Sequence, residues 1–335
     1  MAVDGTGNLY FADTFNNRVR VVTSDGKINI VAGNGSSQES GDDGPAIGAG
    51  ISMPLAIALG AGGKIYVSQL LRDVRLLTPS STPAFPLPSI ETKGVFSASA
   101  FGPFAQTALG SWVEIYGSYL ATNSRSWGGT DFSGISAPIS LDGTSVTIGG
   151  QPAALSYISP GQINAQVPTN IGTGAQSLIV TTAAGKSVPY SVIVNGVEPG
   201  LLAPTSFTIG AKPYVVALFP DNATYVLPTG AITGVPSRPA KAGDTITLYG
   251  LGFGAVTPAV PGGQIVQARN ILALPFSLDF GSVQATVTYS GLAPGYVGLY
   301  QFNVIVPQVS GAVPVLLRFT LGGVSGTQQL YVSVQ

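Results

Sequence analysis

Short runs in which apolar and polar residues alternate recur along the whole chain. They are clear at 145–148, 245–248 and 284–289, where Val, Ile, Leu or Ala alternates with Ser, Thr or Gln. Such alternation puts one face of a strand into a core, and Gly, Pro, Asn and Asp bound each run as they bound strands. Helical spacing of apolar residues is interrupted by Gly or Pro wherever it starts. The pattern therefore predicts an all-β fold.

One pattern occurs twice. Residues 162–168 read Gln-Ile-Asn-Ala-Gln-Val-Pro, and residues 301–307 read Gln-Phe-Asn-Val-Ile-Val-Pro. Three further pairs of blocks keep the same order, namely 110–117 with 243–250, 141–148 with 278–287, and 177–181 with 315–320. Collinear blocks predict two copies of one domain of about 100 residues, with strands spaced as in an immunoglobulin-like sandwich. We assign the sandwiches to 95–197 and 241–335, joined by a Pro- and Gly-rich segment, 198–240, that adds a strand or two.

The duplicated motif has a simple structural interpretation. Residues two apart in a strand share a face, so its apolar residues point into the core. These residues are Ile163, Ala165, Val167, Phe302, Val304 and Val306. The amides of Gln162 and Asn164, and of Gln301 and Asn303, then lie side by side on the opposite face. We expect them to tie neighbouring strands or loops together, and a ligand-facing role is the alternative.

Several motifs in 95–335 carry a family resemblance. Residues 116–120, 159–168, 249–254 and 298–301 read YGSYL, SPGQINAQVP, YGLGFG and GLYQ. With them this region resembles the uncharacterised C-terminal domain found on many large secreted proteins of soil acidobacteria. Each half is similar to an IPT/TIG immunoglobulin-like fold. The resemblance implies secretion and a sandwich fold, and it brings no activity with it.

The first 78 residues follow another repeat. The stretch 7–22, GNLYFADTFNNRVRVV, recurs in degraded form at 63–77 as GKIYVSQLLRDVRLL. This repeat resembles the NHL repeat of β-propellers, and residues 1–78 hold about one and a half units. A propeller needs about four blades to close. We therefore expect a fragment of a longer gene product, with a blade-like sheet docked on the sandwiches as the alternative, followed by a Pro- and Ser-rich linker at 79–94.

Composition narrows the chemistry. Charged residues make up 9% of the chain, and 14 basic residues nearly balance 15 acidic ones, so no electrostatic footprint for nucleic acid exists. The chain has no Cys and no His, which removes thiol catalysis, Ser-His-Asp triads and the commonest transition-metal ligands. No apolar run reaches the ~18 residues that span a bilayer. We expect no cofactor and no membrane insertion, and we place any export signal outside this stretch.

Two clusters are candidate sites. Val113 and Ile115 should face the core, which puts Trp112, Glu114 and Tyr116 in a row on the outer face. An exposed aromatic row beside a carboxylate suits sugar rings, and Glu114 is the weak catalytic candidate. The alternative is that the row packs against the other domain or the connecting segment.

The second cluster lies in a Gly-rich loop of the first region. Its acidic side chains, Glu39, Asp42 and Asp43, could offer oxygen ligands to Ca²⁺. The loop lacks the spacing of an EF-hand and its closing Glu. We therefore expect a solvated acidic loop and no metal site.

Three functions fit these features. The first is an extracellular or cell-surface, non-catalytic binding or adhesion module, or a structural one, for a surface polymer such as a polysaccharide or for a protein. The second is a glycoside hydrolase that uses a carboxylate pair, since no histidine or cysteine is available. The third is a self-assembling filament or surface-layer subunit. Few charges on a chain with 45% hydrophobic residues also predict self-association.

Overall fold

The computed structural model describes residues 1–70, 73–79, 86–310 and 314–335. The protein is all-β, with 47% strand and 6% helix, and the helical residues form 3-10 turns, as the alternating sequence predicts. The chain divides into two compact units, Met1–Leu87 and Pro88–Gln335. In the described part of the chain, no helix is long and apolar enough to cross a membrane.

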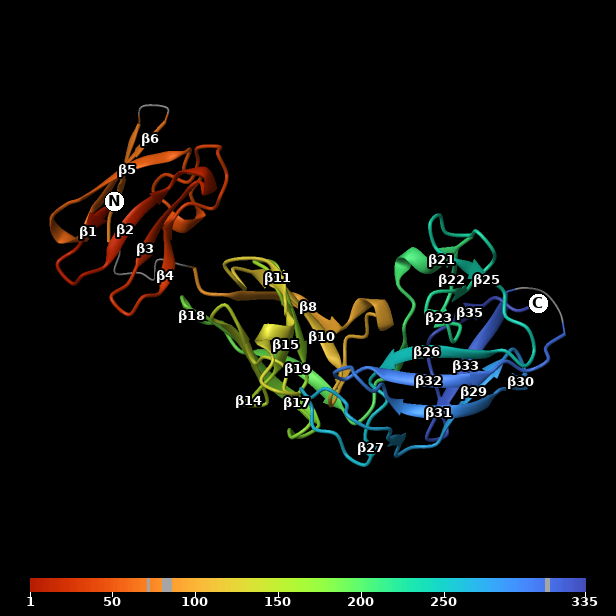
Figure 1. Ribbon diagram of the computed structural model, residues 1–335. Coiled ribbons are helices and arrows are strands. Elements are labelled where there is room, and N and C mark those ends of the chain that lie inside the picture. Colours follow the sequence, from red (N-terminus) through yellow and green to blue (C-terminus); the bar gives the residue numbers. More distant parts are fainter. Residues whose placement is uncertain (71–72, 80–85, 311–313) are drawn as a thin grey trace. The chain divides into compact units, whose positions relative to one another are not determined.

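The first unit holds two antiparallel sheets, ordered β1-β2-β3-β4 and β5-β6-β7 (Figure 1). Their strands are β1 Ala2–Val3, β2 Leu9–Asp13, β3 Arg18–Val22, β4 Ile28–Ala32, β5 Pro54–Leu59, β6 Ile65–Gln69 and β7 Val74–Leu77, with 3-10 turns η1 Thr14–Asn16, η2 Ala46–Gly48 and η3 Ala61–Gly63. Val19, Ile51, Ile65 and Val67 lie at the centre of the small core between the two sheets. The two sheets therefore form two layers that share one apolar interior.

The second unit begins with a sandwich of two sheets, ordered β11-β15-β16-β10-β8 and β12-β13-β17-β19-β9, with β14 beside β13 and β18 beside β17. The first sheet contains β8 Ser89–Ser97, β10 Trp112–Ser118, β11 Arg125–Ser126, β15 Ala154–Ile158 and β16 Gln162–Gln166. The other contains β9 Thr107–Ala108, β12 Ser140–Leu141, β13 Thr144–Ile148, β14 Gln151–Pro152, β17 Gly174–Thr182, β18 Gly185–Lys186 and β19 Tyr190–Asn195, and two 3-10 turns are η4 Ser99–Phe101 and η5 Gly129–Asp131.

A second sandwich follows, with sheets ordered β25-β24-β23-β26-β32-β31, where β20 also pairs with β26, and β30-β29-β33-β34, where β35 also pairs with β33. The first of these sheets contains β20 Gly200–Leu201, β23 Ala217–Leu218, β24 Tyr225–Val226, β25 Ser237–Arg238, β26 Thr245–Leu251, β31 Thr286–Leu292 and β32 Tyr300–Ile305. The other contains β29 Phe276–Phe280, β30 Val283–Gln284, β33 Val315–Leu321, β34 Val324–Ser325 and β35 Leu330–Val332. Two small ribbons are β21 Thr208–Ile209 with β22 Lys212–Pro213, and β27 Val256–Thr257 with β28 Ile271–Leu272; η6 is Thr205–Phe207.

Two predicted connections differ from the structure. The linker 79–94 is too long, because β8 starts at Ser89 and pairs with β10; residues 80–85 lie outside the described residues. Past Pro88 the chain has backbone N–H groups to donate, so it can join a sheet. The connecting segment 198–240 supplies β20, β23, β24 and β25 to the second sandwich, more than the strand or two expected.

Both sandwiches place the duplicated motif at the same position. In the first, β10 pairs with β16 so that Glu114 is opposite Asn164 and Tyr116 opposite Gln162. In the second, β26 pairs with β32, with Thr247 opposite Asn303 and Tyr249 opposite Gln301. A bulge also interrupts the next ladder at the same point, just before Tyr157 in β15 and Tyr289 in β31. The equal registers agree with the duplication that the sequence blocks predict.

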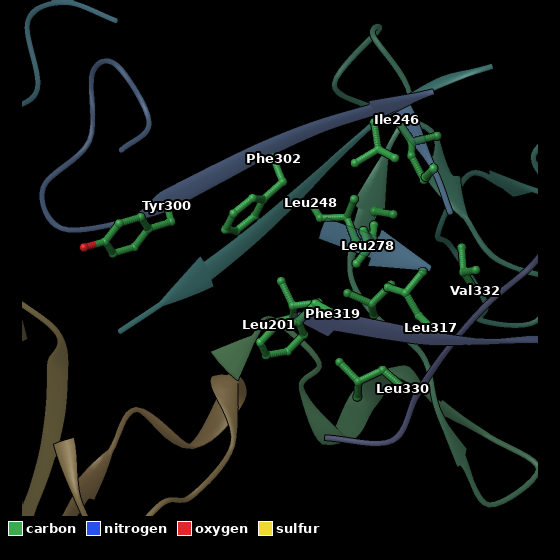
Figure 2. Packing of buried hydrophobic residues seen from close by; sticks show 14 of the residues in the cluster. Leu201, Ile246, Leu248, Leu278, Tyr300, Phe302, Leu317, Phe319, Leu330 and Val332 are labelled. Carbon is green, nitrogen blue, oxygen red and sulfur yellow. The ribbon is translucent and has the colours of Figure 1, made fainter. Parts of the chain in front are cut away.

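Alternate residues of these strands form the two cores. Val113, Ile115, Ile163 and Ala165 are fully buried in the first sandwich, and Figure 2 shows side chains of both sheets meeting in the second. Labelled there are Leu201, Ile246, Leu248, Leu278, Tyr300, Phe302, Leu317, Phe319, Leu330 and Val332. The core positions predicted from the duplicated motif are buried in both copies.

The two sandwiches are joined by direct contacts inside the second unit. The Gln166 amide donates to Gly110 O at 2.8 Å and accepts from the Gly263 N–H at 2.6 Å. Ala203 N donates to Ala100 O at 2.7 Å. At Gly200 a side chain would lie 1.9 Å from the carbonyl oxygen of Phe101, so only glycine fits this approach. These contacts tie the sandwiches into one body.

Candidate functional site

The predicted outer-face row on β10 lies on one face, but most of it is covered. The Trp112 indole N–H donates to Val297 O, 2.9 Å away in the second sandwich, and the Trp112 ring packs edge-on against Trp127 at 5.4 Å. Val297 belongs to the small apolar cluster that these rings contact. Trp112 is therefore partly buried and packs against the other sandwich, which is the alternative that the sequence left open.

Glu114 is also covered, with only 9% of its surface exposed. Its carboxylate accepts hydrogen bonds from Ser99 N and Oγ, both at 3.1 Å, and from the Tyr116 hydroxyl at 3.0 Å. Burial, and then the Glu114 charge, raise the pKa of Tyr116 to about 12, and the Tyr116 ring stacks on Phe96 at 5.4 Å. Through these hydrogen bonds the Glu114 carboxylate orders the start of the sandwich. Glu114 is therefore not part of the exposed row that the sequence predicts.

The duplicated amides bond to each other. Gln162 Nε2 donates to Asn164 Oδ1 at 2.8 Å, and Gln301 Nε2 donates to Asn303 Oδ1 at the same distance. In the second sandwich the Thr247 hydroxyl also donates to Asn303 Oδ1, at 3.3 Å. Each amide pair thus lies within one strand, where neighbouring strands or loops were the expected partners, and the Thr247–Asn303 bond is the link between neighbouring strands.

The acidic loop of the first unit is spread over separate contacts. Asp42 forms an ion pair with Arg75, and Glu39 accepts a hydrogen bond from Gln69 Nε2 at 2.9 Å. Asp43 is exposed. Over the described ranges, no group of three or more His, Cys, Asp or Glu side chains could hold a metal ion. The three acidic side chains of the loop therefore do not gather into one cluster.

The structure adds a site that the sequence analysis missed. A pocket of about 340 Å³ lies beside β31 in the second sandwich. It is lined by Thr257, Arg269, Asn270, Ile271, Val287, Thr288, Tyr289 and Ser290. The lining contains one cation and no carboxylate. An anionic group entering this pocket therefore meets a positive charge from the protein.

A buried polar network fixes one wall of the pocket. Tyr289 is 6% exposed and its hydroxyl donates to Leu292 O at 2.6 Å. The Asn270 side chain, 3% exposed, donates to the same carbonyl at 3.2 Å and accepts from Leu292 N at 2.7 Å. The exposed Arg269 guanidinium lies over the Tyr289 ring, 4.9 Å from its centroid. The ring holds the cation at the mouth of the pocket.

The pocket lies between β31, the last strand of its sheet, and the β27–β28 ribbon, which lies beside β31. Backbone groups of an antiparallel strand alternate between the partner strand and the other side. The N–H and C=O of Leu292 face Asn270, so those of Ser290, two residues earlier, face the open side as well. Ser290 therefore directs its backbone N–H and C=O away from β32, toward the pocket.

The first sandwich fills the equivalent edge with its own chain. There β11 pairs with β15, placing Arg125 opposite Ile158, and Trp127 N donates to Ser156 O at 2.9 Å. The matching stretch of the second sandwich carries Pro258 and Pro261, which have no N–H to donate. This loss of donors is the only sequence signal that could have revealed the open edge.

Comparisons with known proteins agree with the fold. An IPT/TIG domain is found at residues 99–209. Teneurin-4 of Homo sapiens and that of Mus musculus are each 39% identical over 83 residues, covering 21% of this chain and 3% of each relative. The match thus spans a small part of those proteins.

Solved structures show weaker likeness. A mixed-linkage glucan utilization locus protein, SGBP-B of Bacteroides ovatus, solved with a heptasaccharide, has a TM-score of 0.29 and 12% identity, covering 81% of this chain and 52% of its own. Domains 5–6 of the S-layer protein SbsC have a TM-score of 0.24 and 11% identity, covering 74% and 98%. The scores are low, so we argue no function from these likenesses.

Proposed function

We propose that this protein is an extracellular, non-catalytic binding module whose second sandwich docks an extended segment of a protein partner along β31. One observation carries the proposal. Beside the cationic pocket no strand pairs with the outer side of β31, whereas the first sandwich pairs the same edge with β11. The first copy thus supplies an internal example of a segment that fits this place.

Two features of the pocket define the expected partner. Backbone groups of Ser290 favour a strand that adds to the sheet, as in β-augmentation, where main-chain hydrogen bonds supply affinity. Arg269 favours a carboxylate, which a guanidinium can bind through two parallel hydrogen bonds. The expected ligand is an extended peptide with an Asp or Glu side chain near Arg269.

The remaining assignments belong to the same proposal. The resemblance to secreted acidobacterial domains supports an extracellular or cell-surface location. Two small antiparallel sheets that repeat one sequence support an NHL-type origin for the first unit. Polysaccharide binding remains a competing outcome, although the aromatic row that favoured it is covered by Val297 and Ser99.

A display experiment tests the proposal. The whole protein is used to select peptides from a random library, and the binding constants of selected peptides are measured on three variants. We expect acidic peptides whose affinity falls about tenfold or more in Arg269→Ala and in Ser290→Pro, which removes the open-side N–H. Arg318→Ala, an exposed arginine on β33, is the matched control and should leave affinity unchanged.

Other results would overturn it. Peptides that bind Ser290→Pro as tightly as the wild-type protein do not add to β31. Retention on insoluble polysaccharides that is insensitive to Arg269→Ala would instead support a glycan-binding surface elsewhere. Thermal unfolding of each variant shows whether the fold is intact before binding is compared.

A further inference from the structure

The two sheets of the first unit repeat one another in register as well as in sequence. In the first sheet Tyr10 lies opposite Val21, and Ala12 opposite Val19. In the second, Tyr66 lies opposite Leu76, and Ser68 opposite Val74. We call the face that carries these residues the front of each sheet, and the opposite face its back. Val19 and Val74 are therefore equivalent positions, as are Val21 and Leu76.

Equivalent front residues differ sharply in burial. Val19 is 0% exposed and Val21 is 9% exposed, whereas Val74 is 65% exposed and Leu76 is 47% exposed. Tyr66 is 40% exposed beside them. A sheet face with this composition is normally covered, since large apolar side chains are stabilised by removal from water.

The covered front shows what fits it. The front of the first sheet packs on the back of the second sheet in one apolar cluster, which includes Val19 and Tyr10 from one side. The other side supplies Ile57, Leu59, Ile65, Val67 and Leu77. The natural cover for a front of this repeat is therefore the back of another sheet of the same repeat.

The back of the first sheet is the free counterpart. It carries Leu9, Val22 and Ile28 in one row across β2, β3 and β4. Leu9 and Val22 stand where Ile65 and Leu77 stand in the second sheet, and both are partly exposed, while Ile28 is 59% exposed. Each chain thus has one uncovered front, on β5–β7, and one uncovered back, on β1–β4.

We propose that two copies of this chain associate head to tail, the uncovered front of one docking on the uncovered back of the other. The contact would repeat the one already present inside each unit. Arg18 and Arg20 share the docking back with Val22; Arg20 is paired with Asp13 at 2.6 Å, and Arg18 donates to the backbone carbonyls of Asn16 and Asn34. Two copies together supply four sheets, the smallest number that usually closes a propeller.

Charge substitutions at exposed positions test the contact. Light scattering at micromolar concentrations should show a dimer or larger assembly for the wild-type protein. Val74→Lys, on the front, and Ile28→Lys, on the back, should each weaken association about thirtyfold or more, as expected for an interface hot spot. Val324→Lys, at a 73% exposed valine on β34, is the matched control and should associate as the wild type does.

Mixing the two variants tests the head-to-tail geometry. The Val74→Lys chain keeps its back and the Ile28→Lys chain keeps its front, so the mixture should form a heterodimer although each variant alone is a monomer. A monomeric wild-type protein would overturn the proposal. So would a mixture that stays monomeric, or an assembly that Val324→Lys disrupts and Val74→Lys does not. Peptide binding at β31 is a separate readout and should survive Val74→Lys.

Discussion

The two sandwiches share one topology and register, yet they fill their interiors differently. The first core is dominated by aliphatic side chains, and the second gathers Phe253, Phe276, Phe302, Phe319 and Tyr300 into one aromatic group. Strand alternation and turns, which the copies share, therefore define the fold, while the side chains that fill the core can change as long as they stay apolar.

The same comparison separates fold from binding. β15 and β31 contain the same bulge at equivalent positions. On the outer side, β15 pairs with β11, whereas β31 is the last strand of its sheet. The difference arises in a loop, where Pro258 and Pro261 stand in the region that pairs in the first copy. Loops tolerate such change because few core contacts depend on them. The copies thus differ at the edge where we propose that a partner docks.

The largest expected effect tests the difference between the cores. Phe253 is fully buried against four other rings, so Phe253→Ala should lower the free energy of unfolding by about 4 kcal/mol. The equivalent Leu120→Ala should cost about 3 kcal/mol, because a smaller side chain is lost. Urea denaturation of both variants measures the order. A larger loss at Leu120 would mean that the aromatic group is loosely packed.

An intermediate effect is expected at Glu114. Replacing it with Ala leaves Ser99 N–H, Ser99 Oγ and the Tyr116 hydroxyl without their acceptor, and should destabilise the protein by about 1–3 kcal/mol. Thr247 occupies the equivalent position in the second copy and gives one hydrogen bond, so Thr247→Ala should cost about 0.5–1.5 kcal/mol. Equal losses in urea denaturation would contradict the structural role assigned to Glu114.

The smallest effect concerns acid and the ion pairs of Arg125 in the first sandwich. Hydrogen bonds from Arg125, and then from Gly128 N–H, lower the pKa of Asp131 to about 2, and Arg125 with Asn123 lowers the pKa of Asp142. A lowered pKa stabilises the fold above the ordinary value of 3.8, and that contribution is lost as the pH falls toward about 2. The melting temperature should fall less steeply between pH 4 and 2 in Arg125→Ala than in the wild-type protein. Parallel curves would show that these exposed pairs contribute nothing.

The alternation of apolar and polar residues predicted the strands and which of their side chains face the core. The faces of Ile163 and Gln162 follow from a period of two, and β16 and β32 hold them as expected. The cover of Trp112 comes from Val297, far along the chain, and no spacing rule reveals such a contact. The β31 pocket exists because a strand is missing beside it, and an unpaired edge leaves little trace in sequence. Sequence thus predicted the sheets but not what covers them.

The amide pairs on the outer faces have a further consequence. Gln162 with Asn164, and Gln301 with Asn303, satisfy their polar atoms through neutral groups that do not titrate. Neutral hydrogen bonds are also indifferent to the screening that weakens exposed ion pairs as salt rises. We therefore expect both hydrogen bonds to persist at high salt, at low salt and in mild acid. These two contacts therefore differ from the Arg125 ion pairs, whose strength depends on pH and salt.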